Sequence, residues 1–579
     1  MRFPIPLLLL GLLALLRPLP ASAEFEIFKR DVDPFTGTEV RATTPFERVP
    51  TRGFMPVKVT IQNDYPQERT WSVTFRSQPS YGPGGSRFLS SYSVTTTGMS
   101  ETEHAFMVPV ATKADRGLEA ELQLTVQSGR LMAQGNYQSL PNMDWRSVAF
   151  SKGLAGLNNL DELSKAVDAK GSLSSGGQPA AGIFEPSELP ADWRTLSGFD
   201  VILLSQKEWD ALEPTVRDTF LGWARMGGHL HLFGPNGRGD EEIGMGYLVR
   251  WQWDGLKIPF EAVANFLDSR SPNLLGAIRE GYQTTPLQSA FGIKDFNPLL
   301  VFLILAAFAI VVGPVNLQVW AKPGMRHRLF ITTPIISLTA SLILLLIILF
   351  GDGFGGTGRR AGFILLRSQS EERQAHLVQE QIARTGVLAG RGFPAIDGAW
   401  FSPVIMNKSR WTHFDDSYAI DAGFQLGNGR LGGDWFRSRS EQMHLARAVV
   451  PTRARLELVA AGGNGQAPQL FNSLGYGLKT LYYKDPSGAF WRSKGPVASG
   501  QPVQLETVAP GEFDKAWEQT AKSFSTFWEA NIRRLRDQPN QFLAEAENPG
   551  SELLPSLPSL RWSNDLLFVA GEPVNRTAP

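Results

Sequence analysis

The chain has 579 residues, with 56 basic and 56 acidic side chains and no cysteine. A net formal charge of zero gives no overall field that would draw nucleic acid or acidic partners to the protein. The absence of cysteine excludes disulfides, thiol nucleophiles and thiolate metal ligands. The length allows three or four domains, and the abundance of glycine, proline and aromatic residues favours β-rich domains with many turns.

Residues 1–23 have the pattern of a secretory signal peptide. Arg2 precedes a short apolar run at residues 7–16, and the small residues at 21–23 form a cleavage site. The run is too short to span a bilayer. A retained anchor is the alternative, because Arg17 and Pro18 are unusual after such a run. In both cases the chain from Glu24 onward is expected to be exported.

Residues 24–146 predict a β-sandwich. Val57, Val59 and Ile61 alternate with polar residues, as on one face of a half-buried strand, and a second alternation follows at residues 71–75. Further short strands separated by turn residues are expected up to residue 126. This spacing is typical of a sandwich.

Residues 147–295 predict an α/β domain. The continuous apolar run at residues 199–205 indicates a strand buried on both faces of a parallel sheet. Pro214 begins an amphipathic helix, and the glycines at 227 and 228 end it before a strand at residues 229–233. Strand, helix and strand within such a short stretch form a βαβ unit.

Two apolar runs without charged residues, at 298–320 and 329–350, predict two transmembrane helices. Each has about 22 residues, and about 20 helical residues span the hydrocarbon core of a bilayer. The hinge at residues 321–328 contains Lys322, Arg326 and Arg328 and no acidic residue. Short basic loops stay in the cytoplasm, so both flanking regions are expected outside it. A pair of buried core helices is the alternative that we consider unfavourable.

Residues 351–579 predict a second exported, β-rich domain, which we interpret as another β-sandwich. Within it, aromatic and aliphatic residues at helical spacing indicate an added amphipathic helix at residues 513–536. This helix would pack on its own domain, which we favour, bind a partner, or lie on the membrane surface.

The segments FDVILLS, at residues 199–205, and LGWARMGGHLHLFG, at 221–234, resemble the core of class I glutamine amidotransferase-like domains. The order of the whole chain, with Gly313 to Asn316 in the first apolar run, resembles a group of bacterial membrane proteins. These carry an amidotransferase-like domain outside the cytoplasm. The resemblance implies a multi-pass protein of the bacterial inner membrane, with both large regions on the periplasmic side.

Amidotransferase chemistry is not expected, because the family's cysteine nucleophile is missing and no G-x-S-x-G elbow holds a serine in its place. His229 and His231 share one face of a strand, and a metal site would need a third ligand such as Asp240, Glu241 or Glu242. We favour instead two histidines satisfied by neighbouring groups.

Two further patterns resemble binding motifs only weakly. The glycines at 351, 353 and 356 match G-x-G-x-x-G but follow an apolar helix instead of a strand, so they predict a linker. Four polar residues could suggest calcium, but a solvated turn is favoured; they are His413, Asp415, Asp416 and Asp421.

The sequence therefore predicts a non-catalytic, membrane-anchored envelope protein that presents exported domains to a partner or ligand. The expected partners are the lipid bilayer and envelope proteins, with no nucleic acid, cofactor or metal. The alternatives are an envelope hydrolase or transferase with a histidine/carboxylate site, and an accessory subunit of a transport assembly. Two helices without an ionisable residue form no transport pathway by themselves.

Overall fold

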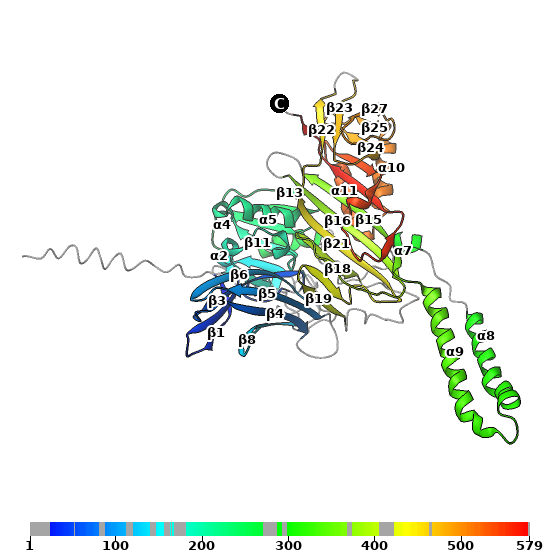
Figure 1. Ribbon diagram of the computed structural model, residues 1–579. Coiled ribbons are helices and arrows are strands. Elements are labelled where there is room, and N and C mark those ends of the chain that lie inside the picture. Colours follow the sequence, from blue (N-terminus) through cyan, green and yellow to red (C-terminus); the bar gives the residue numbers. More distant parts are fainter. Residues whose placement is uncertain are drawn as a thin grey trace, which may run out of the picture.

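The computed structural model describes residues 24–50, 52–79, 87–111, 120–138, 146–155, 162–163, 165–166, 181–269, 286–291, 298–367, 373–404, 422–462 and 466–576. The chain is a multidomain protein of mixed α/β structure with several β-sheets, from which two apolar helices project (Figure 1). The predicted signal segment and the polar cluster at residues 413–421 lie outside the described residues.

We call the described residues outside the two apolar helices the body of the protein. Two facing sheets form its N-terminal part. One has the strand order β1-β2-β3-β6, and the other has the order β17-β20-β19-β5-β4-β7-β8. Phe106 of β6 lies 5.5 Å from Phe75 of β4 and 4.7 Å from Tyr92 of β5, measured between ring centroids, so the sheets pack face to face. The strands are β1 (Phe25–Asp33), β2 (Thr38–Thr44), β3 (Phe54–Asn63), β4 (Arg69–Pro79), β5 (Arg87–Thr96), β6 (Ser100–Pro109), β7 (Ala120–Ser128) and β8 (Leu131–Gln138).

The larger of these sheets contains strands from both sides of the apolar helices. β19 (Gly423–Gly427) pairs in parallel with β5, and β20 (Arg430–Gly433) and β17 (Phe393–Pro394) extend the sheet further. Phe88 of β5 packs 5.0 Å from Phe424 and 5.9 Å from Trp435, between ring centroids. The sequence predicts separate β-sandwiches at residues 24–146 and 351–579. Instead, the two regions share a sheet, because the backbone groups at the outer edge of β5 form hydrogen bonds with β19.

A six-stranded sheet of order β10-β9-β11-β12-β14-β13 forms the α/β part. The predicted parallel pairing of β11 (Val201–Ser205) with β12 (His229–Gly234) is confirmed. Ile202 packs in the core that contains α5, and Leu203 packs in the core that contains α6, so β11 is buried on both faces. The remaining elements are β9 (Val148–Ser151), α2 (Lys152–Ala155), β10 (Ala181–Phe184), η1 (Pro186–Glu188), η2 (Trp193–Leu196), α4 (Gln206–Ala211), α5 (Pro214–Arg225), β13 (Asp240–Ile243), β14 (Gly246–Gln252), α6 (Phe260–Ser269) and α7 (Pro286–Phe291).

The predicted apolar helices are present and are long and apolar enough to cross a membrane. They comprise α8 (Pro298–Ile310), which continues as the π-helical segment η4 (Val311–Trp320), then η5 (Arg326–Arg328) and α9 (Leu329–Asp352). Pro314 has no amide hydrogen to continue the α-helical ladder, which accounts for the wide turns of η4. Only 6 % and 0 % of the two apolar windows is buried, so these helices are not packed in the core of the body.

The chain after the apolar helices forms a ten-stranded sheet whose longest strands are β15 (Gly356–Arg367) and β16 (Gln374–Thr385). A smaller sheet has the order β26-β23-β22-β31. The other strands are β18 (Ala399–Val404), β21 (Glu441–Pro451), β22 (Arg455–Ala460), β23 (Gln469–Ser473), β24 (Leu478–Lys484), β25 (Phe490–Ser493), β26 (Pro502–Val503), β27 (Leu505–Thr507), β28 (Phe542–Ala546), β29 (Leu560–Trp562), β30 (Leu566–Gly571) and β31 (Val574–Asn575), with η7 (Pro549–Ser551) among them.

The helix expected at residues 513–536 is instead two helices, α10 (Pro510–Ala521) and α11 (Thr526–Asp537). The break lies at Ser525, whose backbone is extended. Its amide and its hydroxyl both donate hydrogen bonds to the buried carboxylate of Glu380 on β16. Trp517 and Trp528 are buried beneath the helices. The apolar face therefore packs inside the protein and is not free to lie on a membrane surface.

Because one sheet joins the two halves, we expect residues 24–297 and 353–579 to associate when they are produced as separate chains. Phe424→Asp in the second fragment should weaken association at least tenfold, since a buried charge without a partner costs several kcal/mol. Phe354→Asp is the matched control, because the Phe354 side chain is exposed. Size-exclusion chromatography, with circular dichroism of each fragment, is the measurement. Separate elution of the unmodified fragments would contradict the shared sheet.

Candidate functional site

The carboxyl edge of the parallel sheet is the place where α/β folds commonly bind ligands. Ser151 ends β9 and Ser205 ends β11, and their hydroxyls donate to the same Glu208 oxygen at 2.7 and 2.6 Å. Gly153 N donates to the other Glu208 oxygen at 3.0 Å. Ser205 and Glu208 also form the capping box of α4. Both hydroxyls are thus bound to a carboxylate that closes the strand ends, and neither is hydrogen-bonded to an imidazole that would activate it as a nucleophile.

The two histidines singled out in the sequence lie together beneath α6. Their rings are stacked 6.4 Å apart, and the Phe266 ring lies 5.6 Å from that of His231. Trp251 Nε1 donates to His231 Nδ1 at 2.8 Å, which places the His231 proton on Nε2. Burial, with Arg146 nearby, lowers the pKa of His231 to about 3, so the ring is neutral.

The carboxylates considered as a third metal ligand have other partners. Glu241 pairs with Arg250 at 3.2 Å, and Glu242 pairs with Arg534 of α11 at 3.4 Å. Within the described part of the chain, no group of three or more histidine and carboxylate side chains could hold a metal ion.

A buried ion pair joins the N-terminal sheets to the α/β part. The Arg52 guanidinium, which is fully buried, donates to Asp200 at the start of β11. The second Asp200 oxygen accepts from Ser147 N at 2.9 Å and from Ser147 Oγ at 3.1 Å. Nearby, Phe54 N donates to Ser197 Oγ at 3.0 Å. These bonds hold the first strand of the α/β sheet against the N-terminal part.

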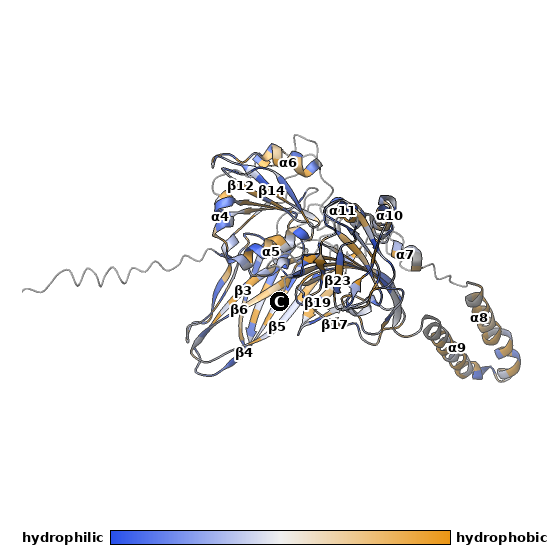
Figure 2. Cartoon of the chain, turned by 90° about the horizontal axis from the view of Figure 1, so that it is seen from above, coloured by the Kyte–Doolittle hydropathy of each residue, from blue (hydrophilic) through white to orange (hydrophobic). Residues whose placement is uncertain are grey.

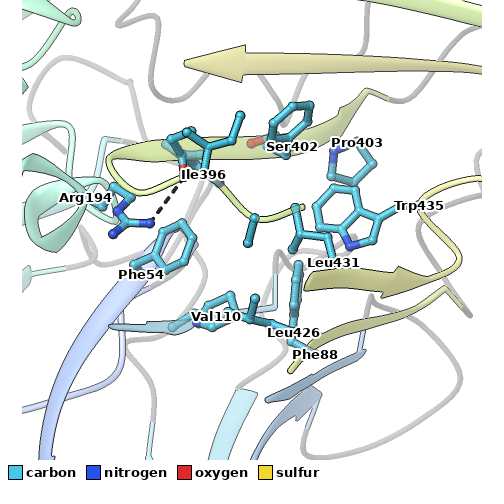
Figure 3. Close-up of a pocket in the computed structure, with 16 residues that line it drawn as sticks. Phe54, Phe88, Val110, Arg194, Ile396, Ser402, Pro403, Leu426, Leu431 and Trp435 are labelled. Carbon is cyan, nitrogen blue, oxygen red and sulfur yellow. Dashed lines mark hydrogen bonds between the residues drawn. The ribbon is translucent and has the colours of Figure 1, made fainter. Parts of the chain in front are cut away.

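Three parts of the chain also meet around a small apolar cavity, drawn in Figure 3. Phe54 and Phe88 line it from the N-terminal sheets, Arg194 from η2, and Leu431 and Trp435 from the region after the apolar helices (Figure 3). Its volume is 50 Å³, whereas ligand sites usually exceed about 300 Å³. This cavity is a packing seam and is too small for a substrate.

A larger open cleft of 480 Å³ lies beside that seam, between η2, α5 and the edge of the ten-stranded sheet. It is lined by Asp218 and Asp397, and by Asp192, which is held in a two-pronged ion pair by Arg194. Trp193 is fixed in the wall because its Nε1 donates to Gly398 O at 2.7 Å. The cleft is polar and of ligand size, and nothing in the sequence singled it out, since its walls come from segments about 200 residues apart.

The free end of the N-terminal sheets presents an exposed apolar tip. Phe35, in the turn between β1 and β2, is 98 % exposed, and Met99, in the turn between β5 and β6, is 69 % exposed. Asp33 accepts hydrogen bonds from Phe35 N at 3.1 Å and from the Tyr65 hydroxyl. Tyr65 O in turn accepts from Met99 N at 2.9 Å. The two apolar side chains are therefore held in water by cross-braced turns.

Carboxylates predominate around this apolar tip. The Lys29 ammonium is paired with Glu39 at 2.9 Å, and the Arg69 guanidinium lies over the Tyr65 ring at 3.6 Å. The hydrogen bond from Tyr65 also lowers the pKa of Asp33 and keeps it ionised. The exposed or partly exposed carboxylates of this end are Asp31, Asp33, Asp64, Glu68 and Glu101. A rigid apolar tip with an acidic surround is a surface suited to a protein with an apolar pocket and a basic rim.

No family model matches the chain, and no curated protein matches it. Among solved structures, a cycloisomaltooligosaccharide glucanotransferase of Paenibacillus sp. is 12 % identical, with a TM-score of 0.16, over 33 % of this chain and 27 % of that one. The mu-homology domain of yeast delta-COP-I is 9 % identical, with a TM-score of 0.17, over 38 % of this chain and 97 % of that one. The chain thus spans about a quarter of the glucanotransferase, and scores at this level assign neither a fold nor a function.

Removing one member of the buried ion pair should be costly. Arg52→Met removes the guanidinium that Asp200 binds directly and leaves Arg146 as its more remote cation, and we expect a loss of about 3–5 kcal/mol in the free energy of unfolding. Adding Asp200→Asn should recover part of that loss. Arg250→Met, in the exposed pair with Glu241, is the control and should change stability by at most about 1 kcal/mol. Urea unfolding measures all three. Equal, small effects of Arg52→Met and Arg250→Met would contradict the role of the buried pair.

Neutral buried histidines predict a loss of stability in mild acid. Burial lowers the pKa of His231 and His376 to about 3 and that of His444 to about 4, whereas the unfolded value is about 6.5. The unfolded chain therefore binds more protons, so this stability is complete above about pH 6.5 and is lost as the pH falls toward 4. Each histidine should contribute about 1.4 kcal/mol per pH unit in that range.

The measurement is the free energy of unfolding in urea between pH 7.5 and 5.5. The slope of this free energy against pH should correspond to about three protons taken up on unfolding. His444→Gln should reduce that number by about one. His327→Gln is the control, because His327 lies in the exposed hinge. A free energy that does not change over this pH range would show that these histidines are not buried in the neutral form.

Proposed function

We propose that this chain is a membrane-anchored envelope protein of the bacterial inner membrane that binds a protein partner through its exported body and catalyses no reaction. The pairing of β5 with β19 carries the proposal. Because residues on both sides of the apolar helices belong to one sheet, both must lie on the same side of a membrane. Two spanning helices joined by a short hinge satisfy that requirement.

The side is inferred from charge. The hinge contains Lys322, Arg326 and Arg328 without an acidic residue, which favours the cytoplasm for the hinge and the periplasm for the body. The predicted signal segment agrees with export. We also propose that the α/β part descends from the amidotransferase-like domains that it resembles in sequence. It would then have kept the scaffold and lost the reactive site, since function resides in grafted residues.

Several observations support binding over catalysis. The ends of β9 and β11 that would hold a nucleophile are closed by Glu208, and the histidine pair is buried, with His231 neutral. Among the described residues no element covers the rigid apolar tip around Phe35, although it is costly to hold a phenylalanine in water. We assign the partner contact to this tip. A ligand-binding role at the polar cleft lined by Asp218 and Asp397 is the second candidate, because that cleft has the volume of a ligand site.

The cysteine-free chain allows a direct test of the membrane orientation. Single cysteines would be placed at Pro34, next to Phe35 in the exposed turn, at Gly324 in the hinge and at Ser487 in an exposed turn of the region after the apolar helices. We expect an impermeant maleimide to label the first and third sites in intact spheroplasts, and the hinge site only after permeabilisation. Labelling of the hinge in intact spheroplasts, with neither body site labelled, would refute the orientation.

The same variants test partner binding. In native membranes the cysteine at position 34 should react at least fivefold more slowly than in the purified protein, because the partner bound at Phe35 covers it. The cysteine at Ser487 is the matched control and should react equally in both. High salt should restore the reactivity at position 34, since the contact is partly electrostatic. Equal reactivity at position 34 in membranes and in the purified protein would contradict a partner at the apolar tip.

A further inference from the structure

An apolar groove of 570 Å³ runs between the two long apolar helices. Phe308 and Val311 line one side, and Ile336 and Thr339 line the other. Trp320 and Thr332 form the end near the hinge. Figure 2 shows that both helices are hydrophobic along their length. The groove is therefore a long apolar slot with a tryptophan, an interfacial residue in membrane proteins, at the hinge end.

The helices are fastened to each other at the hinge end. Asn316 of η4, which is fully buried, donates its Nδ2 hydrogen to Thr333 Oγ1 of α9 at 3.1 Å. Such polar contacts between helices hold membrane hairpins together. Figure 1 shows α8 and α9 as a hairpin that projects from the body. The fastening positions the hinge relative to the groove.

Two exposed cations of the hinge lie close in the chain to the residues that line this end of the groove. The residues of α9 that line the groove recur every three or four positions and include Ile336 and Thr332, so they lie on one face of the helix. Arg328, the last residue of η5, lies four positions before Thr332. Thr332 Oγ1 donates to Arg328 O at 3.0 Å, which links this lining residue to the hinge. Lys322 follows Trp320 by two residues. Within the described residues, neither Arg328 nor Lys322 pairs with a carboxylate.

We propose that the groove is a binding site for one anionic glycerophospholipid. Its acyl chain would lie along the apolar lining, and its phosphate would be held by Arg328 and Lys322. This inference rests on the proposed function, since it places the hinge at the headgroup level of the cytoplasmic leaflet, whose surface is negatively charged. Charge decides the occupant. A helix of another membrane protein would fill the apolar slot but would leave the two cations unmatched.

The test uses the purified full-length chain in detergent, with native mass spectrometry as the readout. Phosphatidylglycerol and phosphatidylcholine with identical acyl chains are the probes. We expect one phosphatidylglycerol to bind at least tenfold more tightly than phosphatidylcholine. The Lys322→Gln/Arg328→Gln variant should reduce phosphatidylglycerol binding to the phosphatidylcholine level without changing the latter. Ala340→Trp, at a lining position, should weaken the binding of both lipids.

Arg130→Gln is the control, because Arg130 is an exposed cation of the β7–β8 turn, and it should change nothing. Near-ultraviolet circular dichroism checks that every variant is folded. Equal binding of the two lipids, or a preference that survives the double glutamine variant, would overturn the proposal. So would a photocrosslinker at Ile336 in native membranes that captures a protein and no lipid. The two proposals are tested independently. Mass spectrometry measures lipid binding whatever the orientation in the membrane, whereas maleimide labelling reports only the orientation.

Discussion

The parallel pairing of β5 with β19 is the constraint on which the rest of the architecture depends. It brings together segments more than 300 residues apart, with both apolar helices between them. A chain that leaves a sheet, crosses a membrane and returns to the same sheet must cross an even number of times. If the two apolar helices span a membrane, as we propose, the shared sheet places the residues before and after them on one side of that membrane and the hinge on the other.

The body is held together by polar contacts that are buried between its parts. Arg52 and Asp200 connect the N-terminal sheets to the α/β sheet, and Glu380 binds Ser525 at the start of α11. Both arrangements remove charge from water, which is unfavourable unless the geometry supplies partners. Arg534 of α11 also bonds the hydroxyl of Tyr247 on β14, and its guanidinium lies over that ring at 4.6 Å. Such contacts favour one arrangement of the parts over others, which suits a body that presents fixed surfaces.

The residues that we considered as candidate catalysts or metal ligands take part in similar contacts. The strand-end serines cap helices, the histidine pair packs under Phe266, and Glu241 and Glu242 pair with arginines. These serines and glutamates are thus bound to structural neighbours. We assign the cross-braced tip at Phe35 to the partner, and the groove of the apolar helices with its cations to the lipid.

Local pattern was sufficient for some elements. The sequence by itself determined the two apolar helices, the buried strand β11, the helix begun by Pro214, and the alternation of Val57, Val59 and Ile61, because each follows from composition or periodicity within about 20 residues. Only the tertiary structure decided that α10 and α11 are separate helices, since the break depends on Glu380, about 145 positions earlier. It also decided that residues 423–433 complete the sheet of β5, and that the polar cleft and the apolar tip exist. These features depend on which distant segments meet, and a strand carries no local signal that names its neighbour.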